Sequence, residues 1–347
     1  MRLSSTVPAL LAAALASACG GSAHRGSPPP HHVRPDPPPP YTQRVSAPRR
    51  AAIPVRALVT AETENRLLVV ELPSGRVVQR IGLPSDPEDV AASPTGGVVV
   101  VTSAAAGKVT LLEGRPLRAV KIIGGFGAPH IVEIAPDGEY AYITDDAHGT
   151  VTVIDLAKRR VSSTIPVGAG AHHLCFDVKD HDAWVALGES ARMLVLLSTQ
   201  DPGHPRVAGH FPPPFPVHDL GCSSDGPRVW LTSATGPDVT VFDGFDYGVV
   251  FRVPVGPPPQ HVVLQAGSAY LTSGYGGSIE RVDASTGRIL ARASSPYGSF
   301  ELAAGGGYVV TSSLLRGTLA IYTPALKLLR VVHLAPATRE VAIAGPA

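Results

Sequence analysis

The amino-acid sequence predicts an all-β fold in which a unit of about forty residues repeats along the chain. The clearest unit, residues 129–168, contains four short β-type runs separated by tight turns such as the Pro-Asp-Gly turn at 136–138. A single four-stranded sheet cannot bury both of its faces, so each unit requires copies of itself on either side. The 44% hydrophobic content and 36 glycines also suit a turn-rich β protein that buries a large core.

An aliphatic residue marks the same place in the first strand of every unit, and we call it the anchor. Successive anchors are 42, 42, 46, 42, 40 and 39 residues apart. Four-stranded repeats of this length are typical of a β-propeller, which predicts a seven-bladed β-propeller of four-stranded antiparallel blades. The anchors are Val90, Val132, Leu174, Leu220, Val262, Leu302 and Val341.

The first blade is predicted to be closed by the C-terminal strand. Segments 56–60, 66–72 and 76–83 supply its second, third and fourth strands, but no anchor strand precedes them. The segment 339–344, at the other end of the chain, matches an innermost strand. A blade built from both termini removes the open strand edges that otherwise favour aggregation.

One blade resembles the YVTN-type propeller repeat in its sequence. It contains Tyr142-Ile143-Thr144, then Val-Thr-Val-Ile-Asp at 151–155 and Ile-Pro-Val-Gly at 165–168, although Asp145 stands where that family has Asn. The resemblance spans about 55–344 and implies a propeller without fixing a function, because the family includes surface-layer proteins, binding proteins and enzymes.

The same blade also resembles the streptogramin-lyase-type propellers more weakly. Pro129-His130, followed by the Asp137-Gly138 turn, is similar to their repeat opening, and the resemblance implies a metal and a catalytic histidine in the channel. Only this blade carries the full combination, so no catalytic residue is transferred.

The N-terminal region predicts export and attachment to a membrane. Residues 1–18 carry Arg2 and a short apolar run, as in a signal peptide, and the following Cys19-Gly20 resembles a bacterial lipobox. Residues 19–54 are rich in proline and predict a linker, and 55–347 form the propeller. We therefore expect an exported, lipid-anchored protein of the cell envelope with Cys19 as the lipidation site; the alternative is ordinary cleavage after Ala18.

The net charge of +1 conceals an acidic propeller. From residue 57 onward the chain has 22 basic and 27 acidic residues, so it offers no electrostatic case for nucleic acid. We expect a monomeric propeller.

The residue before each anchor predicts a ring of side chains around the central channel. Six of these seven residues can ligate a metal, and carboxylates held close together favour a cation between them. We therefore predict that the ring binds one divalent metal ion, Mg, Mn, Ca or Zn, or a cationic ligand; the alternative is a solvated channel lining without a cofactor. The predicted metal ligands are Asp89, His173, Asp219, His261, Glu301 and Glu340.

The neighbouring positions of the same strands predict a ligand-binding surface. His130, His172 and His218 lie two places before their anchors, and Glu133 lies one place after its anchor, where most blades have a small residue. Cys175 and Cys222 lie one and two places after adjacent anchors, which favours two buried thiols over a disulfide because the offsets point to opposite strand faces.

Two functional hypotheses follow. The first is a surface-tethered propeller that binds a protein, a glycan or a small ligand at the channel mouth. The second is a metal-dependent lyase or lactone hydrolase with the same acidic and histidine ring as its centre.

Overall fold

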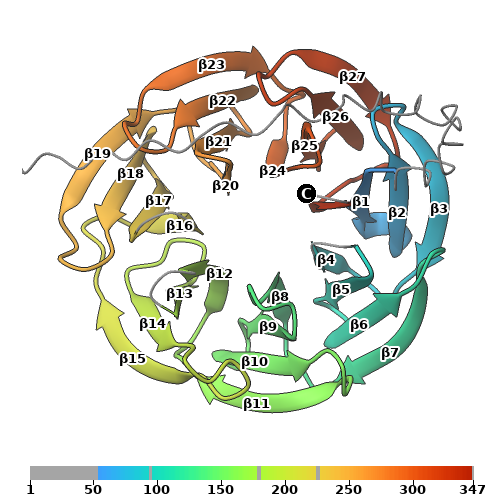
Figure 1. Ribbon diagram of the computed structural model, residues 1–347, viewed down its shortest axis with the longest axis horizontal. Coiled ribbons are helices and arrows are strands. Elements are labelled where there is room, and N and C mark those ends of the chain that lie inside the picture. Colours follow the sequence, from blue (N-terminus) through green and yellow to red (C-terminus); the bar gives the residue numbers. More distant parts are fainter. Residues whose placement is uncertain (1–53, 94–95, 178–180, 224–226, 346–347) are drawn as a thin grey trace, which may run out of the picture. The chain divides into compact units, whose positions relative to one another are not determined.

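Seven sheets follow one another around a central axis (Figure 1). The computed structural model describes residues 54–93, 96–177, 181–223 and 227–345. Within them, 28 strands form seven antiparallel sheets of four strands each, which confirms the predicted seven-bladed β-propeller. The predicted signal peptide and all but the last residue of the predicted linker lie outside the described residues.

Each blade runs from an innermost strand at the channel to an outermost strand at the rim. The innermost strands are β28 (Val341–Ala344), β4 (Pro87–Ala92), β8 (Pro129–Ile134), β12 (Ala171–Asp177), β16 (Val217–Cys222), β20 (Val262–Gln265) and β24 (Ser299–Gly305). The second strands are β1 (Arg56–Ala61), β5 (Val98–Ser103), β9 (Tyr140–Asp145), β13 (Asp182–Leu187), β17 (Arg228–Ser233), β21 (Ser268–Ser273) and β25 (Tyr308–Ser313).

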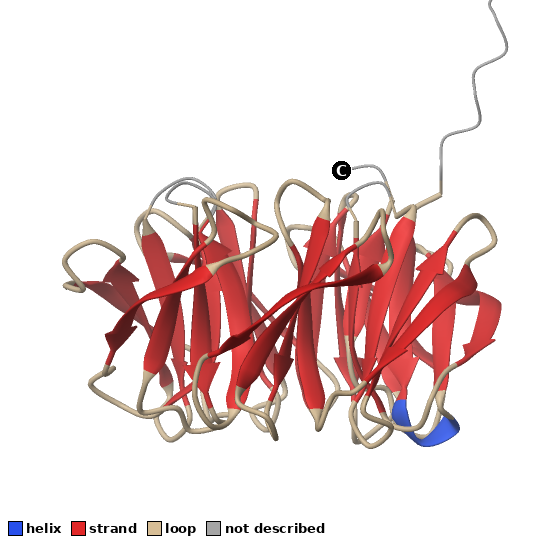
Figure 2. Ribbon diagram, turned by 90° about the horizontal axis from the view of Figure 1, so that it is seen from below, coloured by secondary structure: helices blue, strands red, loops and turns tan. Residues whose placement is uncertain are grey.

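The outer half of each blade is built in the same way, and a short 3-10 helix, η1 (Glu62–Glu64), follows β1. The third strands are β2 (Arg66–Glu71), β6 (Lys108–Glu113), β10 (Thr150–Asp155), β14 (Leu194–Ser198), β18 (Asp238–Asp243), β22 (Ser278–Asp283) and β26 (Thr318–Tyr322). The outermost strands are β3 (Arg76–Gly82), β7 (Arg118–Gly124), β11 (Arg160–Pro166), β15 (Arg206–Phe211), β19 (Val249–Pro254), β23 (Ile289–Ser294) and β27 (Leu328–His333). Figure 2 shows the ring from its side, with loops gathered on both of its faces.

The C-terminal strand closes the first blade, as predicted. β28 pairs with β1 in antiparallel register, with Val341 opposite Val59 and Ile343 opposite Ala57. The backbone ladder continues beyond the strand, because the Thr60 N–H donates to the Glu340 carbonyl at 3.1 Å. The last blade therefore meets a complete first blade instead of an open edge.

A bulge interrupts the ladder between the first and second strands in five of the described blades, at the two residues before the anchor. The bulge leaves the N–H of the residue before the anchor without a partner in the ladder. In blade 2, the Thr102 hydroxyl on β5 accepts the Asp89 N–H at 3.0 Å and donates to the His130 carbonyl of the next blade at 2.7 Å. Thr60, Thr144, Thr232 and Thr272 accept the corresponding N–H in their own blades.

Apolar side chains fill the seven boundaries between neighbouring blades, and each boundary has its own core cluster among the described residues. Anchor residues point back to the preceding blade, and the residue after the anchor points forward to the next. In one such cluster, Ala91 of β4 packs with the anchor Val132 of β8.

The expectation of two free thiols is wrong, because Cys175 and Cys222 form a disulfide with a Cα–Cα distance of 5.6 Å. The offsets of Cys175 and Cys222 from their anchors predict side chains on opposite strand faces, and we expected these faces to point apart. In fact, Cys175 points forward from β12 and Cys222 points backward from β16, so opposite strand faces bring the two sulfur atoms into the same boundary. The described part of the chain contains no helix with the length and hydrophobicity needed to span a bilayer.

We expect deletion of residues 338–347 to lower the thermal midpoint by more than 10 °C, or to make the protein insoluble. The deletion removes buried Val341 and the hydrogen bonds that β1 makes to β28, and it exposes an edge strand. Differential scanning fluorimetry of soluble protein measures the change. The control is Leu328→Ser on the outermost strand β27, where the side chain is 49% exposed; equal midpoints for the deletion and the control would contradict this account of closure.

Candidate functional site

Two cavities meet at the centre of the ring of blades. One has a volume of about 440 Å³ and contains the histidine side chains, and we call it the histidine cavity. The other, of about 360 Å³, lies further along the channel and is lined mainly by the inner strands, and we call it the rear cavity. The residues before the anchors form a layer between them, since Asp89, Ile131, His173, His261, Glu301 and Glu340 line both cavities.

The structure therefore brings the residues selected from the sequence together. His130, His172 and His218 line the histidine cavity, whereas Asp219 and Glu133 line the rear cavity. The bulge explains this arrangement, because it turns two consecutive side chains of each bulged inner strand towards the channel.

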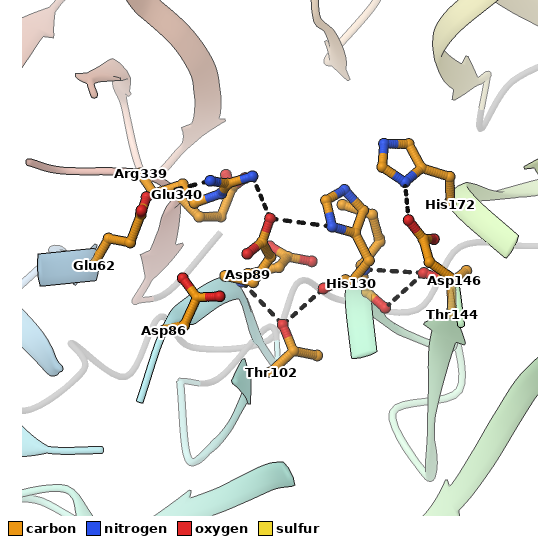
Figure 3. A network of polar contacts seen from close by, with 12 residues as sticks. Glu62, Asp86, Asp89, Thr102, His130, Thr144, Asp146, His172, Arg339 and Glu340 are labelled. Atoms are coloured by element: carbon orange, nitrogen blue, oxygen red, sulfur yellow. Dashed lines mark hydrogen bonds and ion pairs between the residues drawn. The ribbon is translucent and has the colours of Figure 1, made fainter. Parts of the chain in front are cut away.

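Five histidines in this region share one orientation: the Nδ1 atom of each faces an oxygen atom. His172 Nδ1 contacts Asp146 Oδ2 at 2.8 Å and His130 Nδ1 lies 3.1 Å from Glu88 Oε1 (Figure 3). His173 Nδ1 lies 3.2 Å from Asp219 Oδ1.

The remaining two histidines follow the same rule. His218 Nδ1 lies 3.2 Å from the Glu189 carbonyl oxygen, and His261 Nδ1 lies 3.2 Å from Glu301 Oε2 and 3.6 Å from Asp219 Oδ2. Because an Nδ1 that faces an oxygen atom carries the ring proton, we assign the Nε2 lone pair of each neutral imidazole to the cavity side.

The five imidazole rings form one cluster with His173 at its centre. The His130 and His172 rings stack at 3.9 Å, and the His173 ring lies 4.7 Å from His172 and 5.2 Å from His218. On the other side, His218 Nε2 and His261 Nε2 approach within 3.2 Å. Two sets of three donor groups lie close enough to share one metal ion, namely His130 with His172 and His173, and His173 with Asp219 and His261.

Burial keeps four of these rings uncharged. It lowers the pKa of His130 to about 3 and that of His218 to about 4, and it also lowers the pKa of His173 and of His261. These four histidines are therefore neutral at pH 7, which is the form that binds a metal.

The carboxylates of the ring are engaged with the backbone and with the histidines. Asp89 accepts the N–H groups of Val90 and Val132, each at 2.6 Å, and so connects β4 to β8. Asp219 accepts the Val262 N–H at 3.0 Å and connects β16 to β20 in the same way. These acids hold neighbouring inner strands together in addition to any role towards a ligand.

The ring carries less negative charge than its composition suggests. Burial raises the pKa of Asp89 to about 7 and that of Glu301 to about 8, and it raises the pKa of Glu340 well above its ordinary value. Asp219 is the exception: burial alone raises its pKa, but the contacts with His173 and His261 outweigh burial and hold it below the ordinary value. Asp219 is thus the ionised acid at the centre of the ring.

Arg339 closes the acidic side of the histidine cavity. Its guanidinium contacts Glu88 and lies 3.2 Å from Glu62 Oε2, so it joins the last inner strand to the end of β1 (Figure 3). The surrounding acids raise its pKa although burial opposes this. Glu88 and Arg339 neutralise each other, and Glu88 still orients His130.

Sequence reasoning missed Asp146 and Glu189, which lie in loops and orient His172 and His218. Neither residue occurs at a repeated offset from an anchor. The only signal was the Asp145-Asp146 pair in the turn after β9, where Asp145 accepts the Gly127 and Ala128 N–H groups and leaves Asp146 to face His172.

Comparison with known proteins supports the propeller. The family model for the cytochrome D1 heme domain matches residues 94–199, and no curated protein sequence matches the chain significantly. A functionally unknown protein from Desulfotomaculum acetoxidans is 17% identical with a TM-score of 0.73, covering 84% of this chain and 99% of the other. Apo AztD from Citrobacter koseri is 11% identical with a TM-score of 0.65, covering 84% and 98%.

The dihydro-heme d1 dehydrogenase NirN, solved in complex with DHE, is 17% identical with a TM-score of 0.61 over 84% of this chain and 66% of its own. These similarities establish the fold alone. The resemblances to YVTN-type and streptogramin-lyase-type repeats stay predictions.

The histidine cavity does not suit a haem. Imidazole is a ligand that haem iron accepts. A haem also carries carboxylate groups, and among the described residues that line the cavity the one arginine or lysine, Arg339, is already paired with Glu62 and Glu88. Among the described residues, the lining therefore offers no unpaired arginine or lysine to the carboxylates of a haem. We therefore place no haem here.

We expect Glu133→Gln to stabilise the protein at pH 8.5 relative to the unmodified chain, but not at pH 5. Glu133 contacts channel solvent, yet it lies deep within the ring of blades, and this burial together with Asp89 and Asp219 raises its pKa to about 8. Because the unfolded chain loses this proton near pH 4.3 and the folded chain near pH 8, the free energy of unfolding falls as the pH rises between them.

Thermal midpoints at the two pH values measure this effect, with Glu139→Gln on an exposed turn as the control. Solvent contact limits the expected gain to a few degrees. A gain of equal size at both pH values would contradict the raised pKa of Glu133.

Proposed function

We propose that this chain is a ligand-binding propeller whose histidine cavity holds a divalent transition-metal ion. The observation that carries the proposal is the shared orientation of five histidines, each with Nδ1 on an oxygen atom, which turns Nε2 towards the cavity. Metal-binding histidines in proteins are held in this way by carboxylates or carbonyl groups behind the ligand atoms.

His173 is the residue on which binding depends, because it shares a set of possible donor groups with His130 and His172 and its ring also lies 5.2 Å from His218 and 5.6 Å from His261. Asp219 faces Nδ1 of both His173 and His261, so we place it behind these ligands as the group that orients them. The spacing of the neighbouring residues His218 and His261 also fits zinc. Two nitrogen ligands of tetrahedral zinc are about 3.3 Å apart, given Zn–N bonds of about 2.0–2.1 Å. His218 Nε2 and His261 Nε2 are separated by 3.2 Å.

The ligand chemistry narrows the choice of ion. Imidazole nitrogens favour Zn, Cu or Ni, whereas Mg and Ca require several oxygen ligands. Of the four metals that the sequence suggested, zinc therefore fits this cavity. The volume of the histidine cavity suits a small ligand. Binding of a protein or a glycan stays a proposal, and we assign no surface to it.

The second candidate function is the metal-dependent lyase or lactone hydrolase. The observation in its favour is the open histidine cavity beside the imidazoles, because catalytic zinc keeps one coordination position for water or substrate. Turnover of lactones by the zinc-loaded protein, lost in His173→Gln, would favour this candidate over the binding protein.

We further propose that the propeller works outside the cytoplasm, attached to a membrane through lipid on Cys19. The disulfide between Cys175 and Cys222 supports this location, because disulfides persist mainly in oxidising compartments. The proline-rich segment after Cys19 gives the propeller reach from the surface.

Zinc should raise the thermal midpoint of the metal-free protein, whereas Mg and Ca at the same concentration should not. A ligand bound only by the folded state stabilises it by about 2.7 kcal/mol at a hundredfold excess over Kd. His173→Gln should abolish the rise and the stoichiometric zinc found by elemental analysis. The matched control is His204→Ala, whose side chain is 64% exposed beside Asp201 and outside the cavity lining. Failure of zinc to bind or to stabilise the unmodified protein would refute the metal site.

Cys19→Ala should move the protein from the membrane fraction to a soluble extracytoplasmic fraction in a bacterial host that lipidates exported proteins. Acyl chains supply membrane affinity that a polar linker lacks. Fractionation with immunoblotting measures this distribution, and Cys175→Ala/Cys222→Ala serves as the control because those cysteines are joined to each other inside the propeller. A soluble unmodified protein would remove the anchor from the proposal while leaving export untouched.

A further inference from the structure

One wall of the histidine cavity is aromatic, although the other side is polar. Tyr275 and Phe300 line the cavity together with Pro258 and Pro259. The Tyr275 and Phe300 rings meet edge to face at 5.2 Å, and Tyr297 lies 5.8 Å from Tyr275. We call Tyr275 and Phe300 the aromatic wall.

The position of Phe300 is unusual within the repeat. It lies two places before its anchor, where the other six blades have acidic, imidazole, amide or guanidinium groups. Its ring packs directly against the backbone of Gly274, where an added Cβ would clash with it. The Thr272 hydroxyl donates to the Phe300 carbonyl at 2.5 Å, so both the ring and the backbone of this residue are held in place.

Tyr275 contributes an apolar surface that the fold does not need. It follows β21 in a turn, and 52% of it is exposed. Single exposed aromatic residues are ordinary on a protein surface. Here the exposed ring stands over a cavity, beside a second aromatic ring and two prolines, which is the composition of a small-molecule site.

The aromatic wall comes from the same two blades as His261 and Glu301, and these two residues contact each other at 3.2 Å. A ligand that packs on the wall therefore lies beside the imidazoles. A cavity of about 440 Å³ falls within the range of small-molecule sites. The one arginine or lysine among the described residues of its lining, Arg339, is already paired with Glu62 and Glu88, so it leaves no free cation for an anionic ligand.

We propose that the histidine cavity takes a small neutral organic ligand with an aromatic ring and a metal-coordinating group, whose ring packs on Tyr275 and Phe300. This inference rests on the proposed metal site. It adds the class of ligand, because an ion alone makes no use of the aromatic wall.

The experiment uses the full propeller loaded with Co²⁺, whose visible absorption reports ligand exchange, and two probes, imidazole and 4-phenylimidazole. Both coordinate through the same type of nitrogen, so their affinity ratio isolates the contribution of the phenyl ring. We expect 4-phenylimidazole to bind about tenfold more tightly, from apolar burial and ring–ring contact.

Tyr275→Ser and, separately, Phe300→Leu should reduce that preference to threefold or less while the affinity for imidazole stays the same. Tyr275 lies in an exposed turn, so its replacement keeps the test valid if the Phe300 variant is unstable. Phe245→Ser, at a 67% exposed aromatic residue outside the cavity lining, should keep the full preference.

The outcomes separate the two proposals. If Co²⁺ and zinc both fail to bind, the metal site is wrong and the ligand class falls with it. If Co²⁺ binds but the two probes bind equally, or if neither wall variant alters the preference, the metal site stands and the aromatic subsite is overturned.

Discussion

A threonine hydroxyl on five of the second strands is the contact on which the channel depends. An inner strand that bulges towards the axis leaves one N–H outside the ladder, and a buried N–H without a partner is costly. Thr102 satisfies the Asp89 N–H and also donates to the next blade at the His130 carbonyl. Thr272 accepts the corresponding N–H, that of His261, and donates to the Phe300 carbonyl. One side chain thus binds an N–H of its own inner strand and a carbonyl of the next blade, which fixes the spacing of the two blades.

Burial then determines the protonation states of the side chains that this geometry brings into the channel. The channel removes His130 and His218 from water, which lowers their pKa values and leaves neutral rings, while it raises the pKa of acids such as Glu301 and Glu340. Asp219 stays ionised because it faces His173 and His261. A single ionised carboxylate behind two neutral imidazoles differs from the strongly anionic ring that a count of acids suggests, and the proposed metal site rests on this arrangement.

The repeat made the blades, their closure and the channel positions predictable, because an anchor such as Val132 recurs with its neighbours at fixed offsets. Features that depend on how two neighbouring strands face each other are harder to predict from the sequence. The Cys175–Cys222 disulfide was missed because the offsets were read within each strand, whereas pairing depends on the directions in which facing strands point. The histidine partners Asp146 and Glu189 lie in loops, where spacing from an anchor carries no information.

The two layers of channel side chains, one and two places before the anchors, differ in how freely their residues can be substituted. Asp89 and Asp219, in the layer before the anchors, accept backbone N–H groups of the next blade, so their replacement weakens the ring itself. One place earlier, residues such as His130 and Phe300 contribute only a backbone carbonyl to that network, and their side chains are available for a ligand. A propeller built in this way can change its ligand by substitution in the earlier layer without loss of fold. The proposed ligand selectivity therefore rests on the contrast between imidazoles on one side and Phe300 on the other.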